Sequence, residues 1–291
     1  MRELNYSIKD LENFSNIKAH TIRIWEQRYD LLQPKRTHTN IRYYSESDLK
    51  KILNIKLLNS YGHKVSKIAA LSDEEILEKS KEIILSNSCE NHSEIDTLSM
   101  LILAFEGEKI QQFLNDKLKT NSLDELYLGT VLPLLQKIGM LWQVNSIQII
   151  HEHYFSTIYR AFLIAEINKI KTSENTKKNA ILFLHHNEEH EFAILLYQYL
   201  LKKAGYSCHY FGQKIPVNEI EIAFSQIQPT LLISTFTSKL NEKSFYKIQE
   251  TLVKFTPKTK VLISGSQLSH FTISDSVTFI ETIDELKSLI H

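Results

Sequence analysis

The sequence has few cysteines and no long apolar run, and each absence excludes a class of protein. Its two cysteines, Cys89 and Cys208, lie far apart and show no paired spacing. A disulfide framework and a thiolate metal site are therefore both disfavoured. No stretch approaches the roughly 18 apolar residues of a membrane span, and the N-terminus lacks the apolar segment of a signal peptide. We expect a cytoplasmic protein with no membrane partner.

The chain as a whole also has no net charge, but its charged side chains are unevenly distributed. The 291 residues carry 34 basic and 34 acidic side chains. Residues 1–72 hold 13 of the basic and 7 of the acidic ones, so this part carries +6 and the remainder carries −6. A basic N-terminal part on an acidic body suggests that the first part binds a polyanion. Many solvated protein faces carry as much charge, so this observation needs support from motifs.

The pattern of apolar residues divides the chain into three segments, and its length is enough for two or three small domains. Residues 1–72, the head, show short helical patterns. Residues 73–171 have apolar side chains at spacings of three and four, which predicts a helical bundle whose last helix covers residues 147–170. The polar stretch 171–178 predicts a linker. In residues 179–291 the apolar residues follow a different spacing.

In the third segment, short apolar runs alternate with amphipathic helices. This alternation predicts a parallel sheet with helices on both faces, that is, a Rossmann-like or flavodoxin-like domain. The expected strands are 180–184, 207–211, 231–236, 261–264 and 277–280. The expected helices are 189–204, 217–224, 242–255 and a last one from residue 283.

Within the head, residues 9–26 follow a helix-turn-helix pattern. A short helix over 9–14 is followed by a turn over 15–17 and a second helix over 18–26. The second helix of such a motif lies in the major groove of DNA. Its exposed positions can donate to phosphates and base edges, and these are Lys18, His20, Thr21 and Arg23. A small helical domain with a solvated polar face would show the same pattern.

The residues that follow resemble the MerR family of transcription regulators, through the runs 23–37, 40–45 and 61–68 in that family's order and spacing. The resemblance implies a winged helix that binds double-stranded promoter DNA, with Trp25 in its core. It implies further DNA contacts from Arg36, Arg42 and Tyr43 in the wing and from Ser66 and Lys67 near a helix start. One head makes few contacts, so we expect a dimer or tetramer on a repeated or palindromic site.

Two features of the acidic body could bind a ligand. Glu188 and His190 follow the first strand of the third segment, where doubly wound sheets bind their ligands. A histidine beside a carboxylate can be a metal ligand that the carboxylate orients. The second feature is Trp142, followed after nine residues by Glu152 and His153 on the last bundle helix. Each feature has a simpler explanation, as polar loop residues in one case and as a core tryptophan in the other.

Together with the head, these features resemble the cobalamin-binding, light-sensing regulators of the MerR family, in which a helical bundle caps a Rossmann-like corrinoid domain. The resemblance implies that His190, oriented by Glu188, is the lower axial ligand of cobalt in adenosylcobalamin. It implies that Trp142 shields the adenosyl group, that Glu152 accepts a hydrogen bond from it, and that His153 can approach cobalt once that group is lost. The predicted domains are a winged-helix DNA-binding domain (1–72), a helical cap (73–171) and a Rossmann-like cobalamin-binding domain (179–291).

The resemblance also assigns Ser234 and Gly265 to the pocket of the nucleotide tail, and the departures from the family pattern affect this pocket. Ala193 and Ser266 stand where the family has glycine, and Phe236 stands where it has leucine. Glycine is often used where a ligand or backbone approaches closely, so each change adds atoms at a crowded position. The three substitutions therefore predict a looser or altered pocket.

Four functions remain open at this point. The first is a corrinoid-responsive transcription regulator, in which light breaks the cobalt–carbon bond and shifts the oligomeric state and hence DNA affinity. The second keeps the DNA-binding head but uses the body only for assembly or for binding another protein. The third is a zinc or iron site built on His185, His186, Glu188 and His190. The fourth is a cobalamin-dependent enzyme, which the head and the absence of a substrate domain disfavour, so we expect a regulator and not an enzyme.

Overall fold

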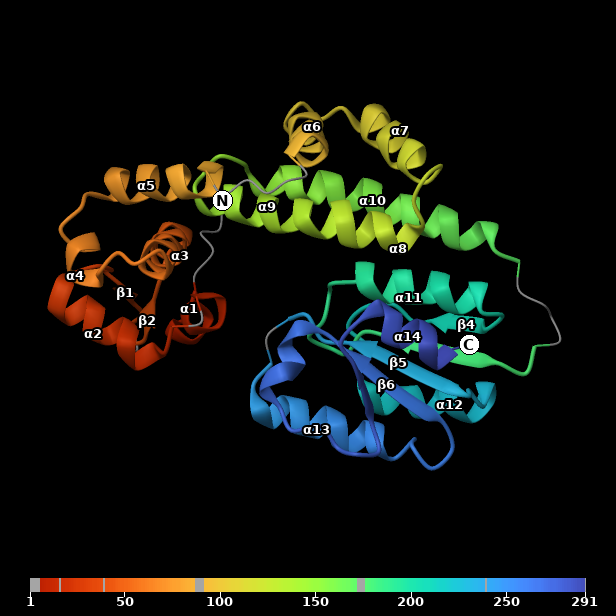
Figure 1. The fold of residues 1–291 in the computed structure, drawn as a ribbon. Helices are drawn as coiled ribbons and strands as arrows, with labels where there is room; N and C mark the ends of the chain where they lie inside the picture. The colour runs from red at the N-terminus through yellow and green to blue at the C-terminus, as the bar shows by residue number, and fades with distance from the viewer. Residues whose placement is uncertain are drawn as a thin grey trace. The chain divides into compact units, whose positions relative to one another are not determined.

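A computed structural model of the chain describes residues 6–15, 17–38, 40–86, 92–171, 176–238 and 240–290. The chain forms two compact units (Figure 1). The first unit comprises Met1–Lys119 and Glu125–Phe155, and the second comprises Thr120–Asp124 and Ser156–His291. Residues 172–175 of the expected linker and Cys89 lie outside the described residues. Within the described ranges, no helix is both long and apolar enough to cross a membrane.

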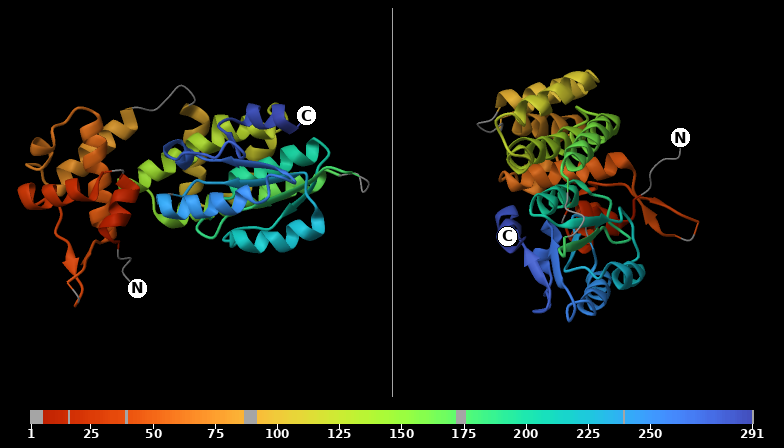
Figure 2. Two further views of the ribbon diagram at one scale, coloured as in Figure 1. Left: turned by 90° about the horizontal axis from the view of Figure 1, so that it is seen from below. Right: turned by 90° about the vertical axis from the view of Figure 1, so that its right-hand side faces the viewer.

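The head of the first unit folds as a winged helix. Its elements are α1 (Ile8–Ser15), α2 (Ala19–Tyr29), β1 (Lys35–Arg36), β2 (Arg42–Tyr43), α3 (Glu46–Ser60) and α4 (Val65–Ile68). The antiparallel β1–β2 hairpin forms the wing, which extends beyond the helices of the head in Figure 2. Ser45 and Asp48 form a capping box at the start of α3, because each side chain accepts a hydrogen bond from the other's backbone N–H.

The core of the head consists of two apolar clusters. One is built around Leu11, Ile22 and Tyr44, and the other around Ile55 and Leu58. Trp25 packs against both clusters, as the sequence predicted for a core residue. The phenol of the buried Tyr44 donates a hydrogen bond of 2.5 Å to Oε1 of Glu26, so the only polar end of this ring is satisfied inside the head.

The cap is helical, as expected. Its elements are α5 (Asp73–Ser86), α6 (His92–Leu103), α7 (Gly107–Lys117), α8 (Leu123–Leu126), the π-helical η1 (Tyr127–Val131), α9 (Leu132–Gln143) and α10 (Ile149–Lys169). The helix predicted over residues 147–170 is α10, which begins two residues later and ends one residue earlier than expected. Pro133 directly follows the π-helical turn η1 in a helical segment that continues from α8 into α9, and it lacks the N–H that would bond to the preceding turn.

The second unit contains a parallel sheet of five strands with helices on both faces, which confirms the predicted fold class. The strands are β3 (Asn179–Phe183), β4 (Ser207–Tyr210), β5 (Leu231–Thr235), β6 (Lys260–Ser264) and β7 (Thr278–Ile280). Their order across the sheet is β4-β3-β5-β6-β7, the flavodoxin-like order. The helical elements are α11 (Phe192–Lys203), η2 (Val217–Glu219), α12 (Ile220–Ile227), α13 (Glu242–Val253), η3 (Ser266–His270) and α14 (Ile283–Ile290). In Figure 1, α11 covers one face of the sheet, and α12 and α13 cover the other.

Three predicted helices of this unit have different bounds in the structure, and the one expected over 242–255 ends at Val253. The helix expected from residue 189 begins at Phe192, because hydrogen bonds to Glu188 hold the backbone of residues 189 and 190 in a loop. The helix expected over 217–224 is a short 3₁₀ turn followed by α12, which continues to Ile227. The longer loop after β3 extends the strand-end region that carries His190.

Candidate functional site

The candidate ligand site of the second unit lies at the carboxyl ends of β3 and β5. The chain order reverses here, because β4 lies on one side of β3 and β5 on the other. Doubly wound sheets bind ligands at this topological switch point. The loop after β3 carries His190, and the loop after β5 carries Ser238. The structure thus brings the predicted strand-end histidine to the edge where a ligand is expected.

Glu188 joins these two loops through hydrogen bonds. Its side chain is fully buried. Oε1 accepts from the backbone N–H of Glu189 (3.0 Å) and His190 (2.9 Å) and from Oγ of Ser238 (2.9 Å). Oε2 accepts from the backbone N–H of Thr237 (2.6 Å) and Ser238 (2.7 Å). Burial alone raises the pKa of Glu188, but the hydrogen bonds, led by that from His190, lower the pKa to about 2. Glu188 is therefore an anion that holds both loops.

The imidazole of His190 is oriented by this anion. Nδ1 lies 2.7 Å from Oε1 of Glu188 and 3.1 Å from Oγ of Ser238. Because Glu188 is ionised, we assign the ring proton to Nδ1, which donates to the carboxylate, so Nε2 is the nitrogen with metal-binding capacity. The side chain of His190 is 64% exposed although its carboxylate partner is buried. The pair has the arrangement of a metal ligand with an orienting carboxylate.

Buried polar atoms that have no hydrogen-bond partner lie at the same strand ends. They are Nε2 of His185, Oγ of Ser234 and Oγ1 of Thr235. Burial lowers the pKa of His185 to about 4, so this imidazole is neutral at physiological pH. A buried polar group without a partner costs on the order of 1–3 kcal/mol. These strand ends therefore carry unused hydrogen-bonding capacity beside the candidate site.

The four-residue metal site considered from the sequence receives no support. Among the residues that the structure describes, no group of three or more His, Cys, Asp or Glu side chains is placed to hold a metal ion. His185 is buried against the ring of Phe236, with the ring centroids 4.7 Å apart, whereas His186 is exposed. The histidines of this loop therefore have separate environments.

Gly265 has a structural requirement that the sequence did not indicate. Its φ of +129° is in the region that favours glycine, and a Cβ at this position would lie 2.0 Å from the backbone oxygen of Phe236. The backbone after β6 therefore packs directly on the backbone after β5. The backbone N–H of Phe236 also donates a 2.7 Å hydrogen bond to the carbonyl of Ser264.

In the first unit, Trp142 lies where the end of α9 contacts the head. Its ring packs against the head cluster around Leu11, and Nζ of Lys50 lies 4.7 Å from the ring centroid. Lys50 also donates to Oδ1 of Asn145 at 2.8 Å. Gln143 donates from Nε2 to Oδ1 of Asn54 at 2.9 Å. These polar contacts were not predicted, although the two buried polar residues Lys50 and Asn54, one turn apart in α3, were a signal for them.

Glu152 and His153 lie near the start of α10. Oε2 of Glu152 is 2.8 Å from Nδ1 of His153, whose side chain is 69% exposed. Both residues and Trp142 belong to the first unit, whereas Glu188, His190, Ser234 and Gly265 belong to the second. Each unit therefore carries part of the residue set that the family resemblance assigns to the corrinoid.

The expected DNA-binding residues all lie on the head. Lys18 is exposed directly before α2, His20 and Arg23 are exposed within α2, and Thr21 is half-buried. Arg36 is exposed in the wing and donates from Nη1 to Oδ1 of Asn40 at 2.7 Å. The remaining positions are half-buried Arg42 and Tyr43 in β2 and exposed Ser66 and Lys67 in α4. Nε of Arg42 lies 3.6 Å from Oε2 of Glu26, so this side chain also stabilises the base of the wing.

Arg42→Ala is expected to weaken DNA binding about tenfold or more on every sequence and to reduce the slope of log affinity against log salt by about one. The reason is that a phosphate contact contributes affinity without sequence information. Fluorescence anisotropy at several salt concentrations, on upstream and unrelated duplexes, measures both quantities. Arg42→Lys is the control, because it keeps the charge near Glu26. Equal affinity and slope in Arg42→Ala and the wild type would contradict the wing assignment.

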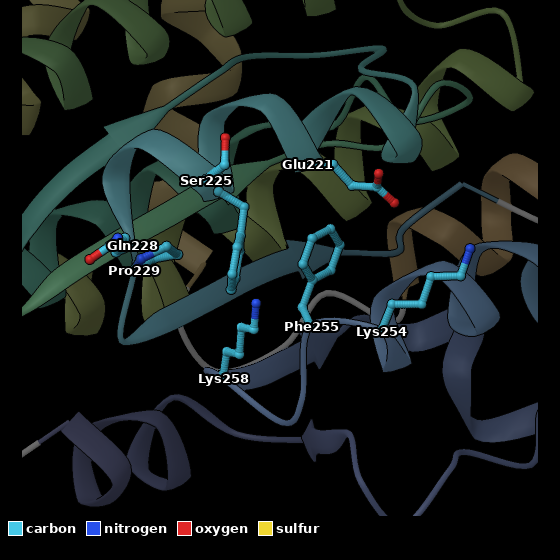
Figure 3. A pocket seen from close by; sticks show the side chains of 8 residues that line it. Glu221, Ser225, Gln228, Pro229, Lys254, Phe255 and Lys258 are labelled. Atoms are coloured by element: carbon cyan, nitrogen blue, oxygen red, sulfur yellow. The ribbon is translucent and has the colours of Figure 1, made fainter.

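A separate cavity of about 600 Å³ lies between α12 and the segment that follows α13 (Figure 3). It is lined by Lys254, Lys258 and Glu221, among other residues. Gln228 and Lys258, which also line it, precede β5 and β6, so the cavity lies at the amino ends of these strands. It is therefore at the opposite edge of the sheet from His190 and is not part of the candidate site.

The fold combines a winged-helix head with a helical cap and a flavodoxin-like domain, and comparisons with known proteins show what the chain is similar to. Residues 6–75 match the family model of the MerR HTH family regulatory proteins. Residues 94–165 match the model of the B12 binding domain. The chain is therefore a MerR-type DNA-binding regulator with a B12-binding domain.

Among individual proteins, the chain is similar to two repressors of Myxococcus xanthus. It is 25% identical to the HTH-type transcriptional repressor CarH over 248 residues, covering 83% of this chain and 82% of CarH. It is 22% identical to the HTH-type transcriptional repressor CarA over 261 residues, covering 89% of this chain and 85% of CarA. The chain is thus homologous to transcription regulators, in agreement with the expectation that it is not an enzyme.

A solved structure shares the fold of a large part of the chain. The monomethylamine corrinoid protein of Methanosarcina barkeri superimposes with a TM-score of 0.53 at 11% sequence identity, covering 68% of this chain and 97% of that chain. At this level of identity, the similarity shows a common fold.

Proposed function

We propose that the protein is a corrinoid-responsive transcription regulator in which His190 is the lower axial ligand of cobalt. The observation that carries the proposal is the buried, ionised Glu188, which orients His190 at the switch point of the sheet. A neutral imidazole with an orienting carboxylate is a good ligand for a transition metal. The homology to CarH and the match to the B12 binding domain support the same class of ligand.

The strand ends beside His190 also carry the unpaired buried atoms of His185, Ser234 and Thr235. These three side chains are at most 1% exposed, so they do not face a corrin ring bound at His190 in this structure. The bound group supplies a cobalt atom and, in adenosylcobalamin, a light-labile upper ligand. This chain supplies the axial nitrogen and its orientation.

Trp142, Glu152 and His153 of the cap are proposed to respond to the upper ligand. Trp142 also contacts the head, through its ring on the core cluster and through Lys50. A change in the position of Trp142 would therefore change contacts of the head directly. We propose that the upper ligand sets the balance between oligomeric states and that illumination shifts this balance. Several heads of one oligomer would together bind promoter DNA in the cytoplasm.

Corrinoid retention tests the proposal. Purified protein is mixed in the dark with adenosylcobalamin or, separately, with adenosylcobinamide, then desalted, and its visible spectrum is recorded before and after illumination. We expect one of the two corrinoids to be retained and to change its spectrum in light. If neither is retained, the body serves only assembly or a protein partner. A retained but light-insensitive corrinoid would leave sensing in place and remove photoreception.

His190→Ala should weaken binding of the retained corrinoid about tenfold or more. Removing a group that only orients a metal ligand already costs about 10–100-fold in metal sites, and this change removes the ligand itself. Titration followed by the visible spectrum measures the dissociation constant. His186→Ala is the matched control, since it removes an exposed imidazole from the same loop. Equal affinity and spectrum in His190→Ala and the wild type would refute the axial role.

A further inference from the structure

We propose that the site selects corrinoids that lack the lower nucleotide, the cobinamide class, and excludes complete cobalamin, because Phe236 fills the space that the nucleotide needs. The inference rests on the proposed function, since it concerns which corrinoid His190 binds. The inference is based on three observations: the packing of four aromatic rings, the backbone around Gly265 and the loops joined by Glu188.

The chemistry of the ligand defines what the protein must provide. The lower nucleotide of cobalamin is a phosphate, a ribose and a benzimidazole on a flexible arm below the corrin ring. When a histidine takes the lower position at cobalt, the benzimidazole is displaced and its arm needs space on the histidine's side of the ring. For a ligand bound at His190, that side is the strand-end region beneath the loops after β3, β5 and β6.

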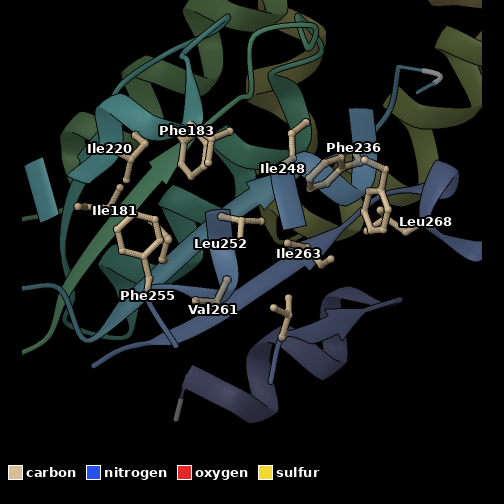
Figure 4. Packing of buried hydrophobic residues seen from close by; sticks show 14 of the residues in the cluster. Ile181, Phe183, Ile220, Phe236, Ile248, Leu252, Phe255, Val261, Ile263 and Leu268 are labelled. Carbon is tan, nitrogen blue, oxygen red and sulfur yellow. The ribbon is translucent and has the colours of Figure 1, made fainter. Parts of the chain in front are cut away.

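This region is filled by a column of aromatic rings. The ring of His185 lies 4.7 Å from that of Phe236, which lies 5.9 Å from that of Phe245, which lies 4.3 Å from that of Phe271. Phe236 is fully buried and, as Figure 4 shows, is part of the packed cluster between the sheet and α13. His185, Phe236 and Phe271 follow β3, β5 and β6 respectively, so the column passes beneath all three loops.

The backbone closes the same region from the strand ends. At Gly265 the chain after β6 lies so near to Phe236 that a single Cβ would be 2.0 Å from its backbone oxygen. Between β3 and β5, the hydrogen bonds of Glu188 to Thr237 and Ser238 hold the two loops together. We therefore expect that an arm as wide as a ribose would have to displace Phe236 to pass between these loops.

Ser234 shows the consequence of this packing. It is 1% exposed, and its Oγ has no hydrogen-bond partner. Side chains two apart in a strand share a face, so Ser234 lies on the same face of β5 as Leu232, a member of the cluster with Phe236. The hydroxyl that the family resemblance assigns to the nucleotide tail is therefore enclosed by apolar side chains.

Phe236→Leu tests the proposal, because it removes the ring and restores the residue type of the family pattern. Dissociation constants of cobinamide and cobalamin are measured by titration followed in the visible spectrum, for full-length wild type and variant. We expect the wild type to bind cobinamide at least about tenfold more tightly than cobalamin, in line with the cost of overpacking a core. In Phe236→Leu, cobalamin should bind about tenfold more tightly than in the wild type, while cobinamide affinity changes less than about twofold.

Phe255→Leu is the matched control. Phe255 belongs to the same core cluster but packs on Phe224 at the amino ends of the strands, so its truncation should change neither affinity. Retained cobinamide binding shows that each variant is folded. Wild-type affinities for the two corrinoids within about twofold, or an unchanged ratio in Phe236→Leu, overturn the selectivity while leaving corrinoid binding intact. If the wild type binds neither corrinoid, the proposed function fails and the selectivity with it.

Discussion

Gly265→Ala is expected to lower the free energy of unfolding of the second unit by at least about 3 kcal/mol, the sum of a strained backbone and an overpacked contact. The φ of +129° disfavours any residue with a Cβ, and the new Cβ would lie 2.0 Å from the carbonyl oxygen, 2.5 Å from the carbonyl carbon and 2.8 Å from the nitrogen of Phe236. None of these atoms is the end of a flexible side chain. Relief requires β5 and β6 to separate at their carboxyl ends.

Gly205→Ala separates the two parts of this effect. Gly205 has a φ of +84° in the same unit, but a Cβ there would meet no atom within 4 Å. This control should therefore cost only the strain, about 1 kcal/mol. Urea unfolding followed by circular dichroism, together with hydrogen exchange of the amides in β5 and β6, measures both variants. If Gly265→Ala is no less stable than Gly205→Ala, the close packing of the two strand ends is wrong.

The parts of the fold that were predicted from the sequence depend on local periodicity. Short apolar runs gave the inner strands β3, β5 and β6 to within about one residue, because an inner strand of a parallel sheet is buried on both faces and reads as apolar throughout. The position of His190 at a strand end followed from the same pattern. Knowledge of the strand then sufficed to place this residue at the switch point.

The parts that were not predicted depend on contacts between residues far apart in the chain. The start of α11 at Phe192 is set by Glu188, whose second set of donors lies about 50 residues later at Thr237 and Ser238. Lys50 similarly meets Trp142 and Asn145 across a separation of more than 90 residues. Periodicity identifies a buried polar residue in a helix, but it does not identify the partner.

The role of Phe236 shows a further limit. The sequence indicated a larger ring in the expected pocket wall and predicted a looser or altered pocket, but it did not show where this ring points. Only the ring contacts with His185 and Phe245 show that the side chain points into the core and fills it. Side-chain direction at the end of a strand depends on what packs beneath it, and local sequence does not fix that.

Glu188→Gln is expected to lower the free energy of unfolding of the second unit by about 3 kcal/mol at pH 7, the equivalent of moving a pKa from 4.5 to about 2. Both oxygens of Glu188 accept hydrogen bonds from donors, from Glu189 and His190 on one side and from Thr237 on the other. An amide nitrogen on either side would face an N–H instead of accepting from it. The substitution should therefore release one loop from the other and leave His190 without its fixed orientation.

The pH dependence gives this prediction its sharpest test. The native pKa of Glu188 is lowered, so its stabilising contribution is complete above the ordinary value of 4.5 and is lost as pH falls towards about 2. The wild type should thus lose about 3 kcal/mol more than Glu188→Gln between pH 6 and pH 2 in urea unfolding. Glu189→Gln, at an exposed neighbouring position, should follow the wild-type profile. Parallel profiles for the wild type and Glu188→Gln would mean that the carboxylate does not hold the two loops, and the orientation of His190 would then need another cause.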